Sequence, residues 1–103
     1  MVTDSAGWTF LTNHAHVLIA IWRGPDSRVR EIASLVGITE RAVMKILSDL
    51  STAGYIEVTK VGRENRYRVV ADLPLRHPLE QQHTVGALLT ALTSDSDLEV
   101  HQT

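Results

Sequence analysis

The sequence predicts a small, mainly α-helical domain that carries one short β-hairpin. Two observations predict this class. Apolar residues recur at helical spacing over most of the chain, whereas residues 55–70 are rich in alternating and β-branched side chains around a glycine turn. The length of 103 residues suits one domain with a modest core. We therefore expect residues 1–93 to form a single domain and the polar residues 94–103 to form a disordered tail.

The composition excludes several classes of protein. The chain has no cysteine, so it can form neither a disulfide nor a thiolate metal site. It has no apolar run that could cross a bilayer and no signal-peptide pattern at its start, so we expect a cytoplasmic protein without a membrane partner. It has neither a glycine-rich phosphate loop nor a nucleophile motif, so we expect no enzyme and no cofactor.

A first helix is expected over residues 13–23, with Thr12 or Asn13 as its N-cap. Its apolar residues are nearly continuous, so more than one of its faces must be buried. The second face could meet another copy of the chain, or the helix could run beneath the whole domain. Gly24 and Pro25 end this helix, and Ser27 can cap the next one.

Residues 28–53 carry two helical patterns joined by a glycine corner. Ala33 allows the two helices to approach closely, and Gly37 can adopt a left-handed backbone conformation without steric cost. Thr39 is a suitable N-cap for the second helix, which is expected over residues 40–53. Such a corner directs the second helix outward, where it could enter the major groove of DNA.

The second helix ends at Gly54, and two strands follow within residues 55–70, joined by a turn at residues 62–65. The order helix, turn, helix, hairpin resembles the winged helix-turn-helix family, and the style is that of small MarR-like and ArsR-like regulators of bacteria and archaea. The glycine corner and the segment Leu50-Ser-Thr-Ala-Gly-Tyr-Ile carry this resemblance. The alternative is an ordinary helical hairpin in another kind of domain.

The resemblance implies a sequence-specific, double-stranded DNA-binding transcription regulator, expected to be a homodimeric repressor. The recognition helix 40–53 would lie in the major groove and the wing tip, residues 62–65, at the minor groove. The charge distribution agrees, because residues 23–68 hold nine of the ten Lys and Arg but only six of the twelve Asp and Glu. The alternative function is a winged-helix module for protein contacts without a DNA role.

The candidate DNA contacts are the polar, cationic and outward-facing residues of this segment. Arg41 is the first choice for a base contact, since a guanidinium can bond guanine in a bidentate manner. Lys45 could reach a base edge or a phosphate, and Met44 could contact a thymine methyl. The predicted set is Thr39, Glu40, Arg41, Met44, Lys45, Ser48, Arg63, Arg66, Arg68, Arg28 and Arg30. For each arginine the alternative is a surface ion pair.

A last helix is expected over residues 79–93, with an apolar stripe at helical spacing. Together with the first helix it would form a dimer interface, or it would pack onto the first helix of its own subunit, and both can hold at once. The predicted interface residues are Trp8, Leu18, Trp22, Val85, Leu88, Leu89 and Leu92. A small-molecule effector could bind between these two helices, although no residue identifies one.

The group His77, Glu80 and His83 has the residue types of a metal site but an awkward geometry. His77 precedes Pro78 and is not expected on the helix that carries the other two residues. We therefore predict no metal site. The histidines are expected to act as caps, interface residues or solvent-facing residues.

Overall fold

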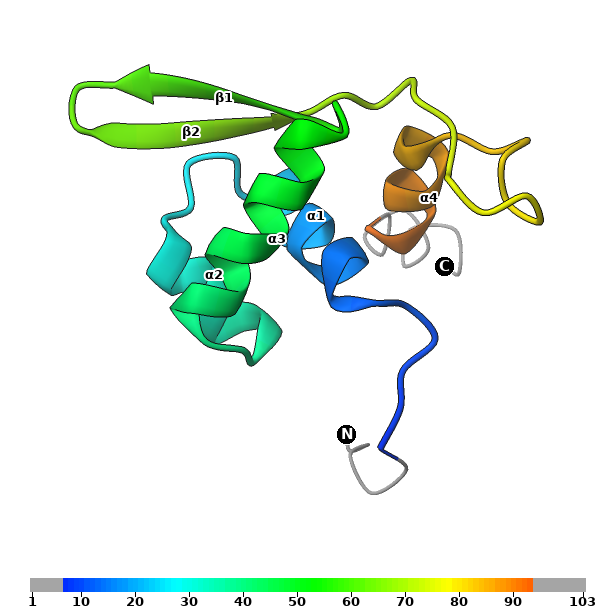
Figure 1. Ribbon diagram of the computed structural model, residues 1–103, viewed down its shortest axis with the longest axis horizontal. Helices are drawn as coiled ribbons and strands as arrows, with labels where there is room; N and C mark the ends of the chain where they lie inside the picture. The colour runs from blue at the N-terminus through cyan, green and yellow to red at the C-terminus, as the bar shows by residue number, and fades with distance from the viewer. Residues whose placement is uncertain (1–6, 94–103) are drawn as a thin grey trace, which may run out of the picture.

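The computed structural model describes residues 7–93 (Figure 1), so the predicted tail 94–103 lies outside the described residues. The predicted class is confirmed, since the described chain is mainly helical with one antiparallel hairpin. The elements are α1 (Asn13–Arg23), α2 (Val29–Val36), α3 (Glu40–Thr52), β1 (Ile56–Val61), β2 (Glu64–Val69) and α4 (Val85–Leu92). In Figure 1, α2 and the hairpin tip lie on one side of the α1–α3 pair, and α4 lies on the other.

Helix α1 is the centre of the core. It contacts α2, α3, β2 and α4, and its residues Val17, Leu18, Ala20 and Ile21 are buried. The apolar residues of this helix are therefore largely buried within one protomer. This agrees with the interpretation in which the first helix runs beneath the whole domain. None of the helices in residues 7–93 has the length and apolar content that spanning a membrane requires.

The corner between α2 and α3 has the predicted geometry. Gly37 ends α2 with φ of 87°, a left-handed conformation that a glycine adopts without strain. The Thr39 hydroxyl accepts a hydrogen bond of 3.0 Å from the Ala42 N–H and caps α3. The prediction for the start of α2 was wrong, because Arg28 rather than Ser27 is the N-cap residue; the Glu31 carboxylate accepts from the Arg28 N–H at 2.8 Å.

The end of α3 leads directly into the hairpin. The Tyr55 N–H donates to the Leu50 carbonyl at 2.8 Å and the Gly54 N–H to Ser51 at 3.1 Å, which is the glycine-terminated helix end expected at Gly54. The turn of the hairpin is shorter than predicted. It consists of Gly62 and Arg63 alone, because Val61 already pairs with Glu64 and Lys60 with Asn65.

Helix α4 begins at Val85 and not at Leu79, so the predicted bounds of 79–93 were wrong. Residues 77–83 form turns, in which the Glu80 N–H bonds to His77 and the His83 N–H to Glu80. Residues 83–86 then run beside residues 71–75, with a bridge between Pro74 and Thr84. This tertiary pairing holds the chain extended up to the N-cap Thr84.

Candidate nucleic-acid interface

Helix α3 has two faces with opposite roles. Val43, Ile46, Leu47 and Leu50 are buried in the core and fix the orientation of the helix. The face turned away from the core carries exposed side chains along its length. These are Glu40, Arg41, Met44, Lys45 and Ser48. The exposure expected for Arg41 and Lys45 is therefore confirmed, and α3 presents cationic groups on a rigid support.

The first turn of α3 offers its backbone to solvent beside polar side chains. Thr39 is exposed while its oxygen caps the helix, and its hydroxyl hydrogen remains available as a donor. The positive end of the helix dipole and the free N–H groups at this end favour an anion such as a phosphate. Glu40 stands in the same turn and opposes an anion there.

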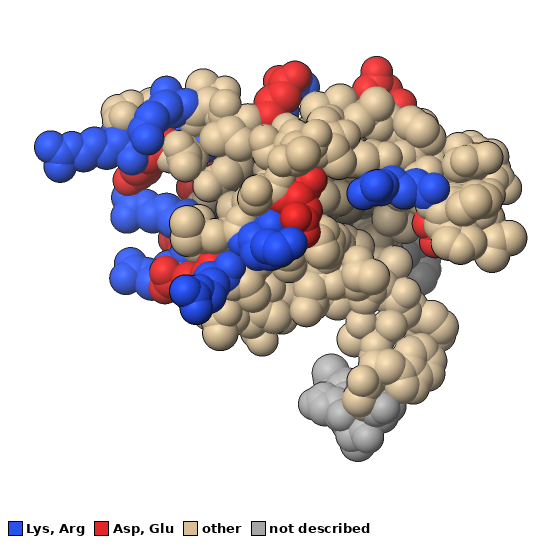
Figure 2. Space-filling model, viewed as in Figure 1, with Lys and Arg blue, Asp and Glu red and all other residues tan. Residues whose placement is uncertain are grey.

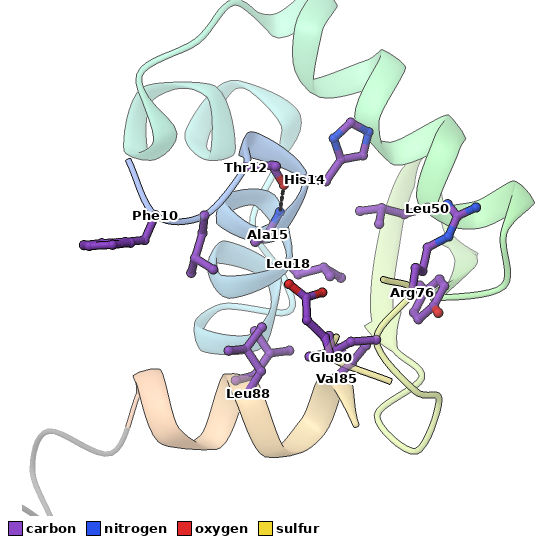
Figure 3. Close-up of a pocket in the computed structure, with 14 residues that line it drawn as sticks. Phe10, Thr12, His14, Ala15, Leu18, Leu50, Arg76, Glu80, Val85 and Leu88 are labelled. Atoms are coloured by element: carbon purple, nitrogen blue, oxygen red, sulfur yellow. Dashed lines mark hydrogen bonds between the residues drawn. The ribbon is translucent and has the colours of Figure 1, made fainter. Parts of the chain in front are cut away.

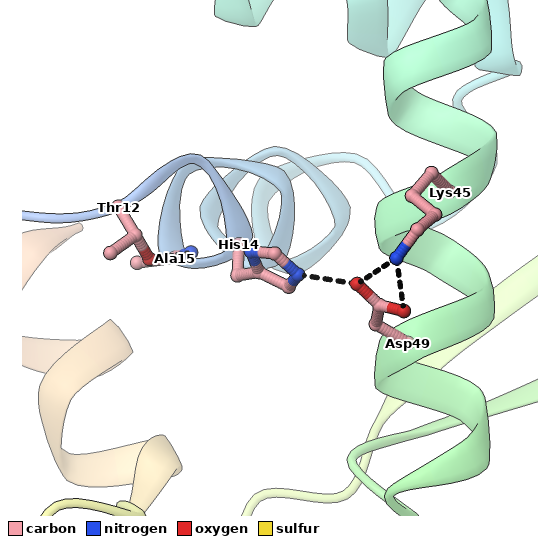
Figure 4. Close-up of polar contacts among 5 residues, drawn as sticks. All are labelled: Thr12, His14, Ala15, Lys45 and Asp49. Carbon is pink, nitrogen blue, oxygen red and sulfur yellow. Dashed lines mark hydrogen bonds and ion pairs between the residues drawn. The ribbon is translucent and has the colours of Figure 1, made fainter.

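Lys45 is not a free cation. Its Nζ lies 3.0 Å from Oδ1 of Asp49, one helical turn further along α3 (Figure 4). Oδ2 of Asp49 in turn accepts a hydrogen bond of 2.8 Å from Nε2 of His14, which stands on α1. The hydrogen bonds from His14 and Lys45 lower the pKa of Asp49 below its ordinary value of 3.8, so the carboxylate is charged at neutral pH.

Three cations of the hairpin and of the α2 start also have acidic partners within residues 7–93. Arg28 pairs with Glu64, and Nε of Arg66 lies 3.4 Å from Asp26. Arg68 pairs with Glu57, which is its direct neighbour across the hairpin. The surface ion pair considered for each arginine is therefore what the structure shows for Arg28, Arg66 and Arg68.

Three of the predicted DNA-contacting cations form no ion pair within residues 7–93: Arg30, Arg41 and Arg63. All three are exposed, on α2, α3 and the hairpin turn respectively. Figure 2 shows that Lys and Arg side chains gather over the half of the molecule that carries the hairpin and the α2–α3 corner. This half thus combines free cations with cations that are partly neutralised.

Sequence reasoning missed the acids that neutralise the other cations. Asp49 follows Lys45 by four residues on a helix, a spacing that predicts an ion pair. The contacts of Asp26 with Arg66 and of Asp49 with His14 join separate elements, and no sequence pattern indicates them.

The predicted dimer residues separate into two groups. Leu18, Val85 and Leu89 are buried within the protomer, so their assignment to an interface between protomers is corrected. The alternative, in which the last helix packs onto the first helix of its own subunit, accounts for them, since α1 and α4 are in contact. The other four predicted residues are partly or fully accessible: Trp8, Trp22, Leu88 and Leu92.

The residues considered for a metal ion do not converge. His77 Nδ1 accepts a hydrogen bond from the Leu79 N–H at 3.0 Å and so closes a turn. Within residues 7–93, no three His, Cys, Asp or Glu side chains stand close enough together to hold a metal ion.

Comparison with known proteins identifies the fold. The chain is similar to the solved structure of a MarR family transcription regulator, with a TM-score of 0.52 and 17% sequence identity. The match covers 90% of this chain and 56% of that chain, so this chain spans little more than half the length of that regulator. Neither a protein-family model nor a curated protein matches the sequence. The molecule therefore has a MarR-like winged helix-turn-helix fold, with the hairpin as the wing.

Proposed function

We propose that this protein is a double-stranded DNA-binding transcription regulator in which α3 lies in the major groove and the hairpin tip at the minor groove. The observation that carries the proposal is the two-faced α3, whose buried face is locked in the core while Arg41 stands exposed and unpaired among residues 7–93. A helix held in this way matches the docking geometry of helix-turn-helix proteins. The likeness to a transcription regulator supports the same function.

In this proposal some exposed side chains contact base edges and others contact the phosphate backbone. Arg41 reads a guanine edge and Met44 rests on a thymine methyl. Ser48 and the Thr39 hydroxyl donate to phosphates, as does the unpaired Arg30. Arg28, Arg66 and Arg68 contact phosphates once the DNA backbone replaces their acidic partners. Arg63 at the hairpin turn reaches the minor groove.

We also propose that two copies bind together and act as a repressor. A dimer would place its two recognition helices roughly 34 Å apart, in successive major grooves of a symmetric site. Trp8 and Leu92 are exposed apolar residues outside α2, α3 and the hairpin, which suits a contact between copies. Sedimentation at micromolar concentration tests this part, and a monomer that binds an asymmetric site would contradict it.

The experiment that tests DNA binding begins with selection of bound sites from random duplexes, followed by titration of the recovered site at several salt concentrations. Arg41→Ala should weaken binding by about 1–3 kcal/mol, and it should relax the base preference at one position. Arg63→Ala should weaken binding and lower the salt dependence by about one counterion. The control is Arg76→Ala, on the 74–84 loop at the other end of the molecule from the hairpin tip (Figure 1), which should bind like the parent.

The alternative of a protein-contact module predicts a different pattern. If no duplex is enriched, or if the affinity is independent of salt and insensitive to both arginine substitutions, the DNA proposal is wrong. The exposed α3 face would then be a surface for another protein.

A further inference from the structure

A cavity of about 380 Å³ (Figure 3) is lined by α4 and the 74–84 loop, which lie at the end of the molecule away from the hairpin tip (Figure 1). Its walls come from the start of α1, the end of α3, the 74–84 loop and α4. The lining is mostly apolar, and its base consists of core residues, among them Leu18, Val85 and Leu89. A pocket with these properties is a candidate binding site for a small molecule.

The loop that forms the rim is held by hydrogen bonds. The Tyr55 hydroxyl donates to the Pro74 carbonyl at 2.5 Å, and the Leu75 N–H donates to the His83 carbonyl at 2.9 Å. The Val85 N–H donates to Leu73 at 2.9 Å. The cavity is therefore built into the fold and does not need a ligand to form.

Two opposite charges line this apolar cavity without neutralising each other. Arg76 and Glu80 both belong to the lining, yet they form no ion pair with each other. In Figure 3 the Glu80 carboxylate points from the loop toward α1, while Arg76 lies beside Leu50. Of the other titratable side chains in the lining, His14 is already bonded to Asp49, and the Tyr55 hydroxyl donates to Pro74. Both Arg76 and Glu80 are exposed, so the rim of the cavity offers one carboxylate and one guanidinium that have no ion-pair partner within residues 7–93.

We propose that this cavity binds a free α-amino acid with an apolar side chain. Its carboxylate would pair with Arg76, its ammonium group with Glu80, and its side chain would lie against Leu18, Leu88 and Leu89. A guanidinium is the preferred bidentate partner of a carboxylate. A plain carboxylic acid would leave the Glu80 charge unmatched, and a plain amine would leave Arg76 unmatched, so the pair of charges selects a zwitterion.

The size of the cavity supports a single amino acid. Pockets for drug-sized ligands span about 300–1,000 Å³. The present volume is near the lower limit of that range and suits one amino acid better than a larger ligand. This site is independent of DNA binding, since the predicted DNA contacts lie on α2, α3 and the hairpin.

The test is calorimetric titration of the full chain with three matched compounds: L-phenylalanine, 3-phenylpropanoate, which lacks the ammonium group, and 2-phenylethylamine, which lacks the carboxylate. We expect phenylalanine to bind about tenfold more tightly than either analogue, a difference of about 1.4 kcal/mol. Glu80→Gln should make the affinity for phenylalanine equal to that for 3-phenylpropanoate. Arg76→Gln should make the affinity for phenylalanine equal to that for 2-phenylethylamine. Lys60→Gln, on the hairpin, is the control and should leave all three affinities unchanged.

Three outcomes would overturn the inference. The first is that one of the analogues binds as tightly as phenylalanine to the parent protein. The second is that phenylalanine produces no heat and no thermal shift up to about 10 mM, a concentration at which even weak binding is detected. The third is a stable dimer that Leu88→Asp dissociates, with no amino-acid binding in either state, because the cavity would then be covered by a second copy. Circular dichroism confirms that each variant is folded.

Discussion

The two ends of this molecule differ in charge, although both expose apolar side chains, among them Leu35 and Met44 at the end with α2 and α3. At the end formed by α2, α3 and the hairpin, the exposed surface carries most of the charged residues, and several cations have acidic partners. At the end formed by the α1 start, the 74–84 loop and α4, large apolar side chains lie in solvent: Phe10 is 92% exposed and Leu79 is 82% exposed. The first surface suits a polyanion, and the second suits an apolar ligand or another protein.

The two ends also differ in how they are stabilised. The corner of α2 and α3 relies on local devices, a left-handed glycine and a threonine cap, together with side chains that the core buries fully. The end with α4 relies on backbone pairing between residues 71–75 and 83–86, which are joined by a loop of turns. We therefore expect the stability of the α2–α3 corner to depend mainly on buried apolar volume. The stability of the end with α4 should depend mainly on the spacing between the paired backbone segments.

The largest expected effect is the loss of a core side chain from α2. Ile32 is 1% exposed, and Ile32→Ala removes buried volume that its neighbours cannot fully replace. The free energy of unfolding should fall by about 2–5 kcal/mol, measured by urea denaturation. Leu35→Ala is the matched control on the same helix, because Leu35 is 68% exposed, and it should change stability by less than about 0.5 kcal/mol. Equal effects of the two substitutions would contradict the orientation of α2.

A smaller effect is expected at Gly86 on α4. A Cβ at this position would lie 2.8 Å from Cβ of Ala71 and 2.9 Å from its carbonyl oxygen, which accepts the Gly86 N–H. Overpacking should cost about 1–3 kcal/mol, and the roughly 1 kcal/mol that alanine gains as a helix former offsets part of this cost. Gly86→Ala should therefore lower the free energy of unfolding by up to about 2 kcal/mol.

Hydrogen exchange locates the effect of Gly86→Ala. Amides of α4 should exchange faster while those of α3 keep their protection, since α4 depends on the 71–75 pairing. Thr90→Ala, at an exposed position of the same helix, is the control and should not accelerate exchange. A more stable Gly86→Ala variant would show that residues 71–75 and α4 can move apart without cost.

The features that the sequence predicted correctly depend on short-range physics. Gly37, Thr39 and Gly54 each act within one helical turn, so their effects are visible in a few consecutive residues. The start of α4 was mispredicted because Glu80 and Gln81 favour a helix locally, whereas pairing with residues 73–75 keeps the chain out of a helix until Thr84. An apolar stripe likewise predicts burial but does not identify the partner, which is why Leu18 and Leu89 were assigned to a dimer.

In the candidate interface, too, the features set by nearby residues could be predicted and those set by tertiary contacts could not. Exposure of Arg41 follows from helical spacing and is present in the structure. The His14–Asp49 contact joins residues 35 positions apart and could not be predicted. It matters because it belongs to the network that holds Lys45, so the charge offered by α3 depends on the packing of α1 against α3.

The smallest expected effect is a change in DNA affinity when the acidic partner of Lys45 on α3 is removed. Asp49→Asn removes the carboxylate that binds Lys45, so one further cation becomes available to the DNA backbone. We expect the affinity for the selected duplex to rise by about three- to tenfold, and the salt dependence to steepen by about one counterion. Titration at several salt concentrations measures both quantities.

Two variants decide whether this gain comes from Lys45 or only from net charge. Asp72→Asn removes an exposed acid outside α3 and the hairpin, and it should raise the affinity much less. Adding Lys45→Ala to Asp49→Asn should return the salt dependence to its original value, because the released cation is then absent. If the double variant binds like Asp49→Asn alone, Lys45 does not reach the DNA, and recognition by α3 depends on Arg41.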